Sequence, residues 1–110
     1  MILDTPSCTD KIPVTYPVSI KDNIVVTCEV KSEPAPLTFV WAFNNTLDYK
    51  KLNTDQHRDQ IYTSTLSYIP YNNNDYGSLM CWAVNRVGQQ ETPCIFKIVQ
   101  AGNIHTVNFL

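Results

Sequence analysis

The chain has no long apolar run, few glycines and little excess charge of either sign. Its 110 residues include 8 Lys and Arg, 10 Asp and Glu and only 3 Gly, and its formal net charge is −2. Such a balance, without a basic stripe, offers little attraction to nucleic acid or to an anionic membrane surface. No segment approaches the roughly 18–20 apolar residues that a membrane span needs. We therefore expect no nucleic-acid partner, and membrane contact only through a parent protein.

The sequence also lacks the residue combinations that are typical of catalytic and metal sites. His57 and His105 stand alone in polar segments with no nucleophile motif around them, and we expect both to be solvated. The carboxylates are scattered without the spacing of a calcium loop. The cysteines do not form the close pairs that are typical of zinc sites. We expect no enzymatic activity, no metal, no cofactor and no small-molecule substrate.

Cysteine is present in an even number, as Cys8, Cys28, Cys81 and Cys94. Two disulfides are the favoured interpretation, and they indicate an oxidising compartment, while free thiols or an intermolecular bond are the alternatives. Asn44 begins the only N-glycosylation sequon, Asn44-Asn45-Thr46, which agrees with an extracellular setting. We expect the extracellular part of a plasma-membrane protein, or a secreted protein.

The spacing of Cys28, Trp41 and Cys81 is the most informative pattern in the chain. It is typical of an immunoglobulin-type sandwich, in which a disulfide joins two packed sheets beside a buried tryptophan. The fold class expected is therefore all-β, with two antiparallel sheets, seven to nine strands and two disulfides. Trp41, Leu66 and Leu79 are expected in the core. For the Cys28–Cys81 loop the chain-entropy model gives a stabilisation of roughly 4 kcal/mol.

Alternating apolar residues separated by turn residues predict strands and give no helical period. The expected strands cover residues 11–16, 23–30, 38–44, 61–69, 77–85 and 94–100, whereas the strands of the polar stretch 45–60 are hard to place. The immunoglobulin-like domain is expected at 11–102. Residues 1–10 are expected to form an N-terminal extension that carries Cys8, and residues 103–110 a linker or disordered tail.

The second bridge is expected between Cys8 and Cys94. In this topology the later part of the first strand runs parallel to the last strand, so both cysteines fall near the same end of the sandwich. A bridge there would clamp the amino-terminal strand, which otherwise frays easily. With the inner bridge formed, the model gives something over roughly 3 kcal/mol for this bridge.

Residues 75–88 carry the pattern D-x-G…C-x-A-x-N-x-x-G in register with Cys28 and Trp41. This stretch resembles the penultimate strand and turn of an I-set or C2-type immunoglobulin domain. The run 28–102 is similar to one domain of the insect Sidestep family. The carrying pieces are residues 39–45, Asp75-Tyr76-Gly77 with Cys81-Trp82, the run 88–96 with its Pro93-Cys94 pair, and the Ala101-Gly102 exit. Nephrin-like and hemicentin-like adhesion proteins are a more distant resemblance.

The resemblance implies a piece of a multi-domain, single-pass cell-surface protein. Sidestep proteins take part in axon guidance and neuronal recognition by binding immunoglobulin-domain partners of the Beaten path family. The implied function is a non-catalytic recognition and adhesion module, with other immunoglobulin-type domains as partners. The alternative is a structural spacer in an extracellular or muscle-type array. Leu79 departs from the pattern because many family members carry a corner tyrosine there.

Two further sets of residues are singled out. Immunoglobulin domains often pair an arginine with an aspartate across the bottom of the sandwich, which implies a structural Arg58–Asp75 ion pair. Strand alternation places an apolar set on the outer face of the last strands, and large apolar patches tend to mark contacts. The alternative is that Lys97 and other long side chains cover this face, or that a bulge changes the register. The expected outward residues are Val40, Ala42, Met80, Trp82, Val84, Ile95 and Val99.

Overall fold

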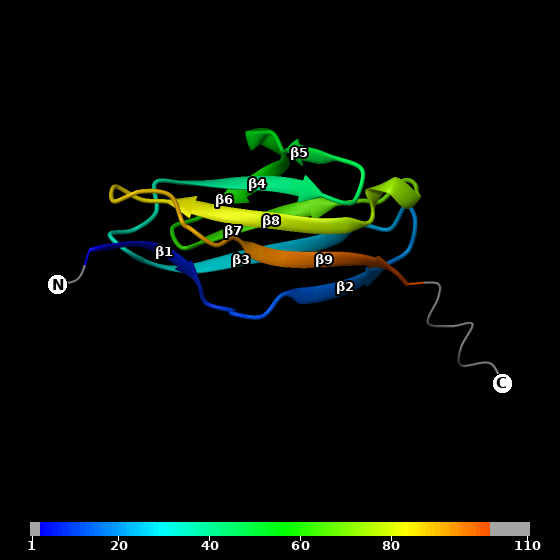
Figure 1. Ribbon diagram of the computed structural model, residues 1–110. Helices are drawn as coiled ribbons and strands as arrows, with labels where there is room; N and C mark the ends of the chain where they lie inside the picture. The colour runs from blue at the N-terminus through cyan, green and yellow to red at the C-terminus, as the bar shows by residue number, and fades with distance from the viewer. Residues whose placement is uncertain (1–2, 102–110) are drawn as a thin grey trace.

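A computed structural model describes residues 3–101, which form two β-sheets packed face to face (Figure 1). One sheet has four strands in the order β1-β3-β7-β6, and the other has five in the order β2-β9-β8-β4-β5. Two single turns of 3-10 helix, η1 and η2, complete the elements of the described chain. The elements in chain order are β1 (Asp4–Cys8), β2 (Val14–Val18), β3 (Ile24–Glu33), β4 (Thr38–Asn44), β5 (Tyr49–Lys51), η1 (Thr54–Gln56), β6 (His57–Asp59), β7 (Thr63–Tyr68), η2 (Asn73–Asp75), β8 (Gly77–Val84) and β9 (Cys94–Gln100).

Neighbouring strands run antiparallel in both sheets, except that β2 and β9 are parallel. The N-terminal segment forms two successive strands in different sheets. Its first strand, β1, pairs with β3, and the chain then crosses to the other sheet, where β2 pairs with β9. Pro17 lies in β2, which is an edge strand, as expected of a residue that cannot donate a backbone hydrogen bond. The predicted all-β sandwich of two sheets is therefore confirmed.

The sandwich begins earlier in the chain than the sequence pattern indicates. The stretch 1–10 was expected to be an extension, but the structure places Asp4–Cys8 in β1, paired with β3. This strand has few β-forming residues, and its pairing is interrupted by a register shift between Asp4 and Ser7, so it shows no clear alternation. β5 and β6 have three residues each, too few to reveal a period. The tail expected at 103–110 lies outside the described residues.

Strand alternation directs one row of side chains from each sheet into a common core. Trp41, Leu66 and Leu79 are buried as predicted, each with 1 % or less of its surface exposed. The indole of Trp41 stacks on Phe96 at a centroid distance of 5.8 Å. At about 25 cal/mol per Å² of apolar surface, burial of such side chains supplies most of the favourable free energy of folding. The other buried members are Cys8, Val18, Val26, Cys28, Val30, Phe39, Phe43, Cys81, Ala83, Cys94, Phe96 and Ile98.

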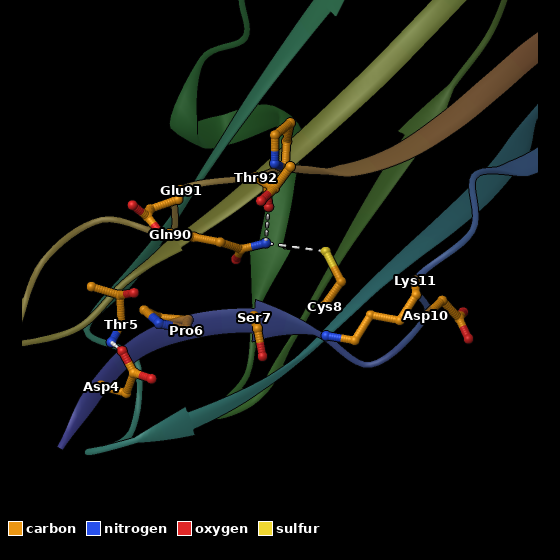
Figure 2. Close-up of a pocket in the computed structure, with 11 residues that line it drawn as sticks. Asp4, Thr5, Pro6, Ser7, Cys8, Asp10, Lys11, Gln90, Glu91 and Thr92 are labelled. Carbon is orange, nitrogen blue, oxygen red and sulfur yellow. Dashed lines mark hydrogen bonds between the residues drawn. The ribbon is translucent and has the colours of Figure 1, made fainter. Parts of the chain in front are cut away.

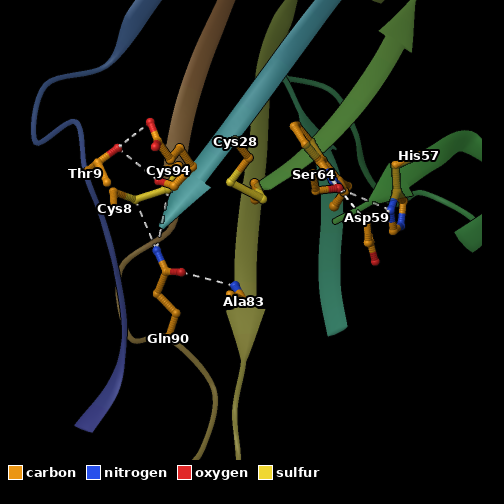
Figure 3. Close-up of a disulfide and its surroundings, with 12 residues drawn as sticks. Cys8, Thr9, Cys28, His57, Asp59, Ser64, Ala83, Gln90 and Cys94 are labelled. Carbon is orange, nitrogen blue, oxygen red and sulfur yellow. Dashed lines mark hydrogen bonds and ion pairs between the residues drawn. A yellow bond between two sulfur atoms is a disulfide. The ribbon is translucent and has the colours of Figure 1, made fainter. Parts of the chain in front are cut away.

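Both predicted disulfides are present, and each joins the four-stranded sheet to the five-stranded sheet (Figure 3). Cys28–Cys81 has a Cα–Cα distance of 6.4 Å, and Cys8–Cys94 one of 5.6 Å. Cys81 and Cys94 face each other in the register of β8 and β9, so the two bridges are neighbours. Their proximity concentrates the covalent cross-links in one part of the sandwich.

The far end of the sandwich, where β7 turns into β8, is held by tyrosine hydroxyl groups. Tyr76 donates to the carbonyl oxygen of Val18 at 2.7 Å, and Tyr68 donates to that of Asp75 at 2.6 Å. Leu79 lies in the core and has no hydroxyl group, so the corner-tyrosine hydrogen bond of many family members is absent at this position. Burial, and then the charge of Asp75, raise the pKa of Tyr68 to about 12.

Candidate recognition surface

The outer face of the five-stranded sheet carries a contiguous apolar set, as the alternation predicts. Val40 lies opposite Trp82 on β4 and β8, and Ala42 lies opposite Met80 in the next outward row. Met80 in turn lies opposite Ile95 on β9. Directly opposed side chains on one face are about 5 Å apart and contact each other. The pairing register therefore joins these residues into one surface; with Val84 we call this set the apolar face.

Members of the apolar face differ in exposure. Val40, Met80, Trp82, Val84 and Ile95 are half-buried because each packs against its cross-strand neighbours. Ala42 was expected outward, and it does lie in the outward row, but it is fully buried. Its short side chain is flanked in register by Met80 and by Lys51 of β5, which explains the burial. The set thus offers a continuous surface rather than isolated protruding side chains.

Charge is distributed unequally between the two sheets. Within the described strands of the five-stranded sheet the charged residues are Lys50, Lys51 and Lys97, and no Asp or Glu occurs. The register places Lys51 beside Ala42, and Lys97 two positions along β9 from Ile95. Neither lysine has a carboxylate within ion-pair distance among residues 3–101. The apolar face is therefore flanked by unpaired positive charge.

By contrast, the four-stranded sheet has a polar outer face. Its central pair β3 and β7 places Thr27 opposite Thr65, and Glu29 opposite Thr63. Acidic residues on its strands are Asp4, Glu29, Glu33 and Asp59. The molecule thus has one outer face suited to an apolar contact and one that is suited to solvent.

The loops at the end where β1 begins are organised by Asn85, a residue to which the sequence pattern assigned no role. Its side chain is almost fully buried, with 3 % exposed. The amide nitrogen donates to the carbonyl of Asp4 at 2.7 Å and to that of Pro34 at 3.1 Å. The amide oxygen accepts from the backbone N–H groups of Val87 and Gly88 at 2.9 and 3.2 Å. One amide therefore holds together the start of β1, the loop after β3 and the turn after β8. The only sign of this role in the sequence was the position of Asn85 in the N-x-x-G part of the motif.

Gln90 plays a similar part beside the outer disulfide. Its Oε1 accepts from the backbone N–H of Ala83 at 3.0 Å, and its Nε2 donates to the carbonyl of Thr92 at 2.7 Å and to Cys8 Sγ at 3.1 Å. Figure 2 shows this amide among the residues that line a cleft of about 340 Å³ between β1 and the segment that precedes β9. Because both ends of the amide are already bonded, the cleft presents it to no ligand.

A serine, a histidine and an aspartate meet beside the buried Trp41, where the edge strand β6 pairs with β7 (Figure 3). The indole Nε1 donates to Ser64 Oγ at 2.8 Å, and this hydroxyl donates to Asp59 Oδ1 at 2.6 Å. His57 lies 2.7 Å from the same carboxylate oxygen and is buried, so the expectation that it is solvated is wrong. The side chain of His57 points inward because successive side chains of β6 point to opposite faces of the sheet. The sequence around His57 gave no sign that Asp59 would be its partner.

This trio has the residue types of a hydrolase triad, but its geometry is that of a structural network. Ser64 is fully buried, and its hydroxyl accepts from the indole while donating to Asp59. An attacking nucleophile needs an oxygen that is open to substrate. Ser64 Oγ lies 3.4 Å from His57 Nδ1 and 2.6 Å from Asp59 Oδ1, but no part of the serine is exposed. The network instead satisfies buried polar groups and ties β4 to β7 across the core.

The implied Arg58–Asp75 ion pair is not formed in the described chain. Arg58 lies on β6 next to the inward-pointing His57, so its side chain points to solvent. The carboxylate of Asp75 accepts from the backbone N–H groups of Tyr71 and Asn72 at 2.8 and 3.3 Å. Capping of the η2 turn therefore occupies the group that the ion pair would have used.

Asn44 is exposed at the end of β4, in the outward row of the five-stranded sheet. The neighbouring Asn45 is bonded within the turn, since its side chain accepts from Leu47 and Asp48 and donates to Asn74. The sequon therefore presents an accessible acceptor on a well-defined turn.

No group of three or more His, Cys, Asp or Glu side chains gathers within residues 3–101 in a way that could hold a metal ion. The described helical turns are three residues long, and none could cross a bilayer. His105 lies outside the described residues.

Comparison with known proteins identifies the fold as that of an immunoglobulin domain. A family model described as an immunoglobulin domain matches residues 5–85. No curated protein matches the chain. Titin domain M4 is similar in structure, with a TM-score of 0.68, 15 % identity and coverage of 91 % of this chain and 99 % of that chain. The Dscam1 Ig7 domain has a TM-score of 0.63 at 20 % identity, with coverage of 87 % and 96 %. A titin M10 complex with an obscurin-like 1 Ig domain gives 0.59 at 17 %, with coverage of 87 % and 95 %. At these identities the structural likeness shows the fold.

Proposed function

The chain belongs to the immunoglobulin domain family, and from this premise we propose that it is a non-catalytic, extracellular recognition module that binds another protein through its apolar face. The observation that carries the proposal is the position of Trp82, half-exposed at the centre of contiguous apolar side chains on one outer sheet. Contiguous apolar patches on protein surfaces tend to mark contacts, and tryptophan is favoured at binding hot spots.

The charges around the apolar face indicate the chemistry of the partner. Lys51 and Lys97 stand on different sides of it, and the strands of this sheet offer no carboxylate to neutralise them. A protein surface with an apolar centre and carboxylates towards its rim would match this arrangement, because complementary rim charges raise the association rate and select the partner. Another immunoglobulin-type domain is the partner that we propose. The similarity to the M10 complex, whose two components are titin and an obscurin-like Ig domain, agrees with this choice.

The finer assignment is to neuronal or axon-guidance recognition at the cell surface. It rests on the resemblance of residues 28–102 to a Sidestep domain, and the structural similarity to Dscam domains is compatible with it. The two disulfides favour an oxidising, extracellular environment. Membrane attachment would then belong to the parent protein.

A glycan on Asn44 would lie on the same outer sheet face as the proposed contact, so its position limits where the partner can bind. Asn44 shares the outward row that also holds Ser78 and Tyr49, two positions along β4 from Ala42. A glycan there would cover the part of the sheet near Lys97, so that Lys51 is the rim charge left to the partner, and it would leave the rows of Val40 with Trp82 and of Thr38 with Val84 open. We therefore place the centre of the contact at Trp82, towards the end where β1 begins.

A matched pair of substitutions tests the proposal. Trp82→Glu introduces a charge at the centre of the apolar face, and Thr65→Glu introduces the same charge at the centre of the opposite outer face. Both variants and the wild-type chain would be screened against a panel of immunoglobulin-domain ectodomains. We expect at least one ectodomain to bind the wild type and the Thr65 variant, and its affinity for the Trp82 variant to fall at least tenfold. Equal binding by both variants, or no binding by the wild type, would contradict the proposal.

The second candidate function is a structural spacer, either in an extracellular array, which the covalent attachment of β1 to β9 favours, or in a muscle-type array. Intracellular arrays of this fold rarely need a second disulfide, so a thiol count under denaturing, non-reducing conditions separates an extracellular setting from a muscle-type array. No free thiol is expected for an extracellular module. Four free thiols would favour a muscle-type array.

A further inference from the structure

The outer disulfide joins two points that lie close to opposite ends of the chain. Cys8 is the last residue of β1, and Cys94 is the first residue of β9. They are 86 positions apart in sequence, yet their Cα atoms are only 5.6 Å apart. Nearly the whole domain therefore lies inside one covalent loop, and only short segments enter and leave it.

Those short segments form an almost straight path through the molecule. Figure 1 shows β1, β2 and β9 running in the same general direction, and the parallel pairing of β2 with β9 agrees. A pull that enters along β1 passes through the Cys8–Cys94 bond and leaves along β9. The strands on this path are already extended at about 3.3 Å per residue, so they have little length left to yield.

We propose that the domain acts as an inextensible, tension-bearing link in its parent protein, with the Cys8–Cys94 bridge carrying force past the fold. Tension between the two ends then does not pull on the hydrogen bonds of β2 with β9 or of β1 with β3. This role does not depend on the apolar face; it rests on the connectivity and on the proposed place of the domain within a longer protein.

The length that the domain releases under tension depends on which of the two bridges is open. If Cys8–Cys94 is open and Cys28–Cys81 is intact, the releasable length is the difference between separations of 86 and 53 positions. At 3.3–3.6 Å per residue this amounts to about 110 Å. If both bridges are open, the full 86 positions yield about 290 Å. The oxidised domain should yield close to nothing.

Single-molecule pulling on the full chain between reference domains of known unfolding length tests the proposal. We expect no long step from the oxidised wild type, a step of about 110 Å from Cys8→Ser/Cys94→Ser, and one of about 290 Å after both bridges are reduced. Reduction with a dithiol transfers two electrons and two protons to each bridge and closes the reagent into a cyclic disulfide. If Cys8→Ser/Cys94→Ser gave no step at forces that unfold the reference domains, the fold would bear the tension without the bridge, and the proposal would be overturned.

Cys28→Ser/Cys81→Ser is the matched control. It removes the inner bridge and keeps the outer one, so we expect no long step from it. This expectation holds whether or not the variant folds, since the covalent loop stays closed in either state. A step near 290 Å from this variant, with its remaining bridge intact, would also contradict the proposal.

Discussion

The two ends of the sandwich are held together by different chemistry. At the end where β1 begins, the Cys8–Cys94 bridge and the buried amides of Asn85 and Gln90 join loops from both sheets. At the other end the hydroxyl groups of Tyr68 and Tyr76 donate to single backbone carbonyls. One end therefore depends on a covalent bond and fully buried amides, and the other on hydrogen bonds at partly exposed residues.

This difference indicates which end of the sandwich loses more stability when a side chain is replaced. A buried group that makes several bonds leaves several unsatisfied partners when it is removed, whereas a half-exposed hydroxyl leaves a carbonyl that water can reach. We expect the β1 end to resist local opening and the tyrosine end to open more readily. The rigid end is also the one nearer to Trp82, which would keep the proposed contact surface in a fixed shape.

The largest effect is expected from removal of the outer disulfide. Cys8→Ser/Cys94→Ser should lower the free energy of unfolding by roughly 3 kcal/mol, because the unfolded chain regains loop entropy. Urea denaturation under non-reducing conditions measures it. A loss below about 1 kcal/mol would mean that the covalent bond does not distinguish the two ends.

Asn85→Ala should have the next largest effect, a loss of about 2 kcal/mol, because two carbonyls and two N–H groups lose their buried partner. Asn45→Ala is the matched control, since that amide also makes several bonds but lies on the turn at the opposite end. We expect about 1 kcal/mol or less from the control. Equal losses from the two variants in the same urea experiment would remove the contrast.

Tyr76→Phe should cost about 1 kcal/mol, the usual contribution of one hydrogen bond. The local consequence should be easier to detect than the global one. Amide hydrogen exchange near Val18 should become faster, while exchange near Asn85 stays unchanged. Faster exchange at both ends would show that the tyrosine bond supports the entire fold.

The smallest effect is expected in alkaline solution. The pKa of Tyr68 is raised to about 12 in the folded chain, above the ordinary tyrosine value of 10.0. The unfolded chain therefore loses this proton first, so stability should fall as the pH rises from about 10 to about 12. Tyr68→Phe should lose less stability over this interval than the wild type. An identical pH dependence for the two proteins would exclude this contribution.

The fold could be predicted because its strongest determinants are local. Cys28, Trp41 and Cys81 have the sequence spacing that is typical of an immunoglobulin-type sandwich, and alternation of apolar residues around them identifies the long strands. β5 and β6 escaped detection because three residues are too few to show a period, and β1 because its composition and its register shift hide the alternation.

The apolar face could also be predicted, since it follows from alternation on β4, β8 and β9. The side-chain bonds could not. Which partner His57 or Asp75 takes depends on the path of neighbouring backbone, and a pairing implied by resemblance alone placed Arg58 with Asp75, which are not paired. Asn85 shows the same limit, because its motif position was visible while its three bonded segments became apparent only in space.

The most direct test of the central claim is to map the contact surface on the bound domain. Backbone amide signals of the isotope-labelled chain would be followed by NMR while an immunoglobulin-domain partner from the ectodomain screen is added. We expect the shifted signals to centre on Val40, Met80, Trp82 and Ile95, with little change at Thr27, Glu29 and Thr65. Shifts centred on the four-stranded sheet instead would contradict the assignment of recognition to the apolar face.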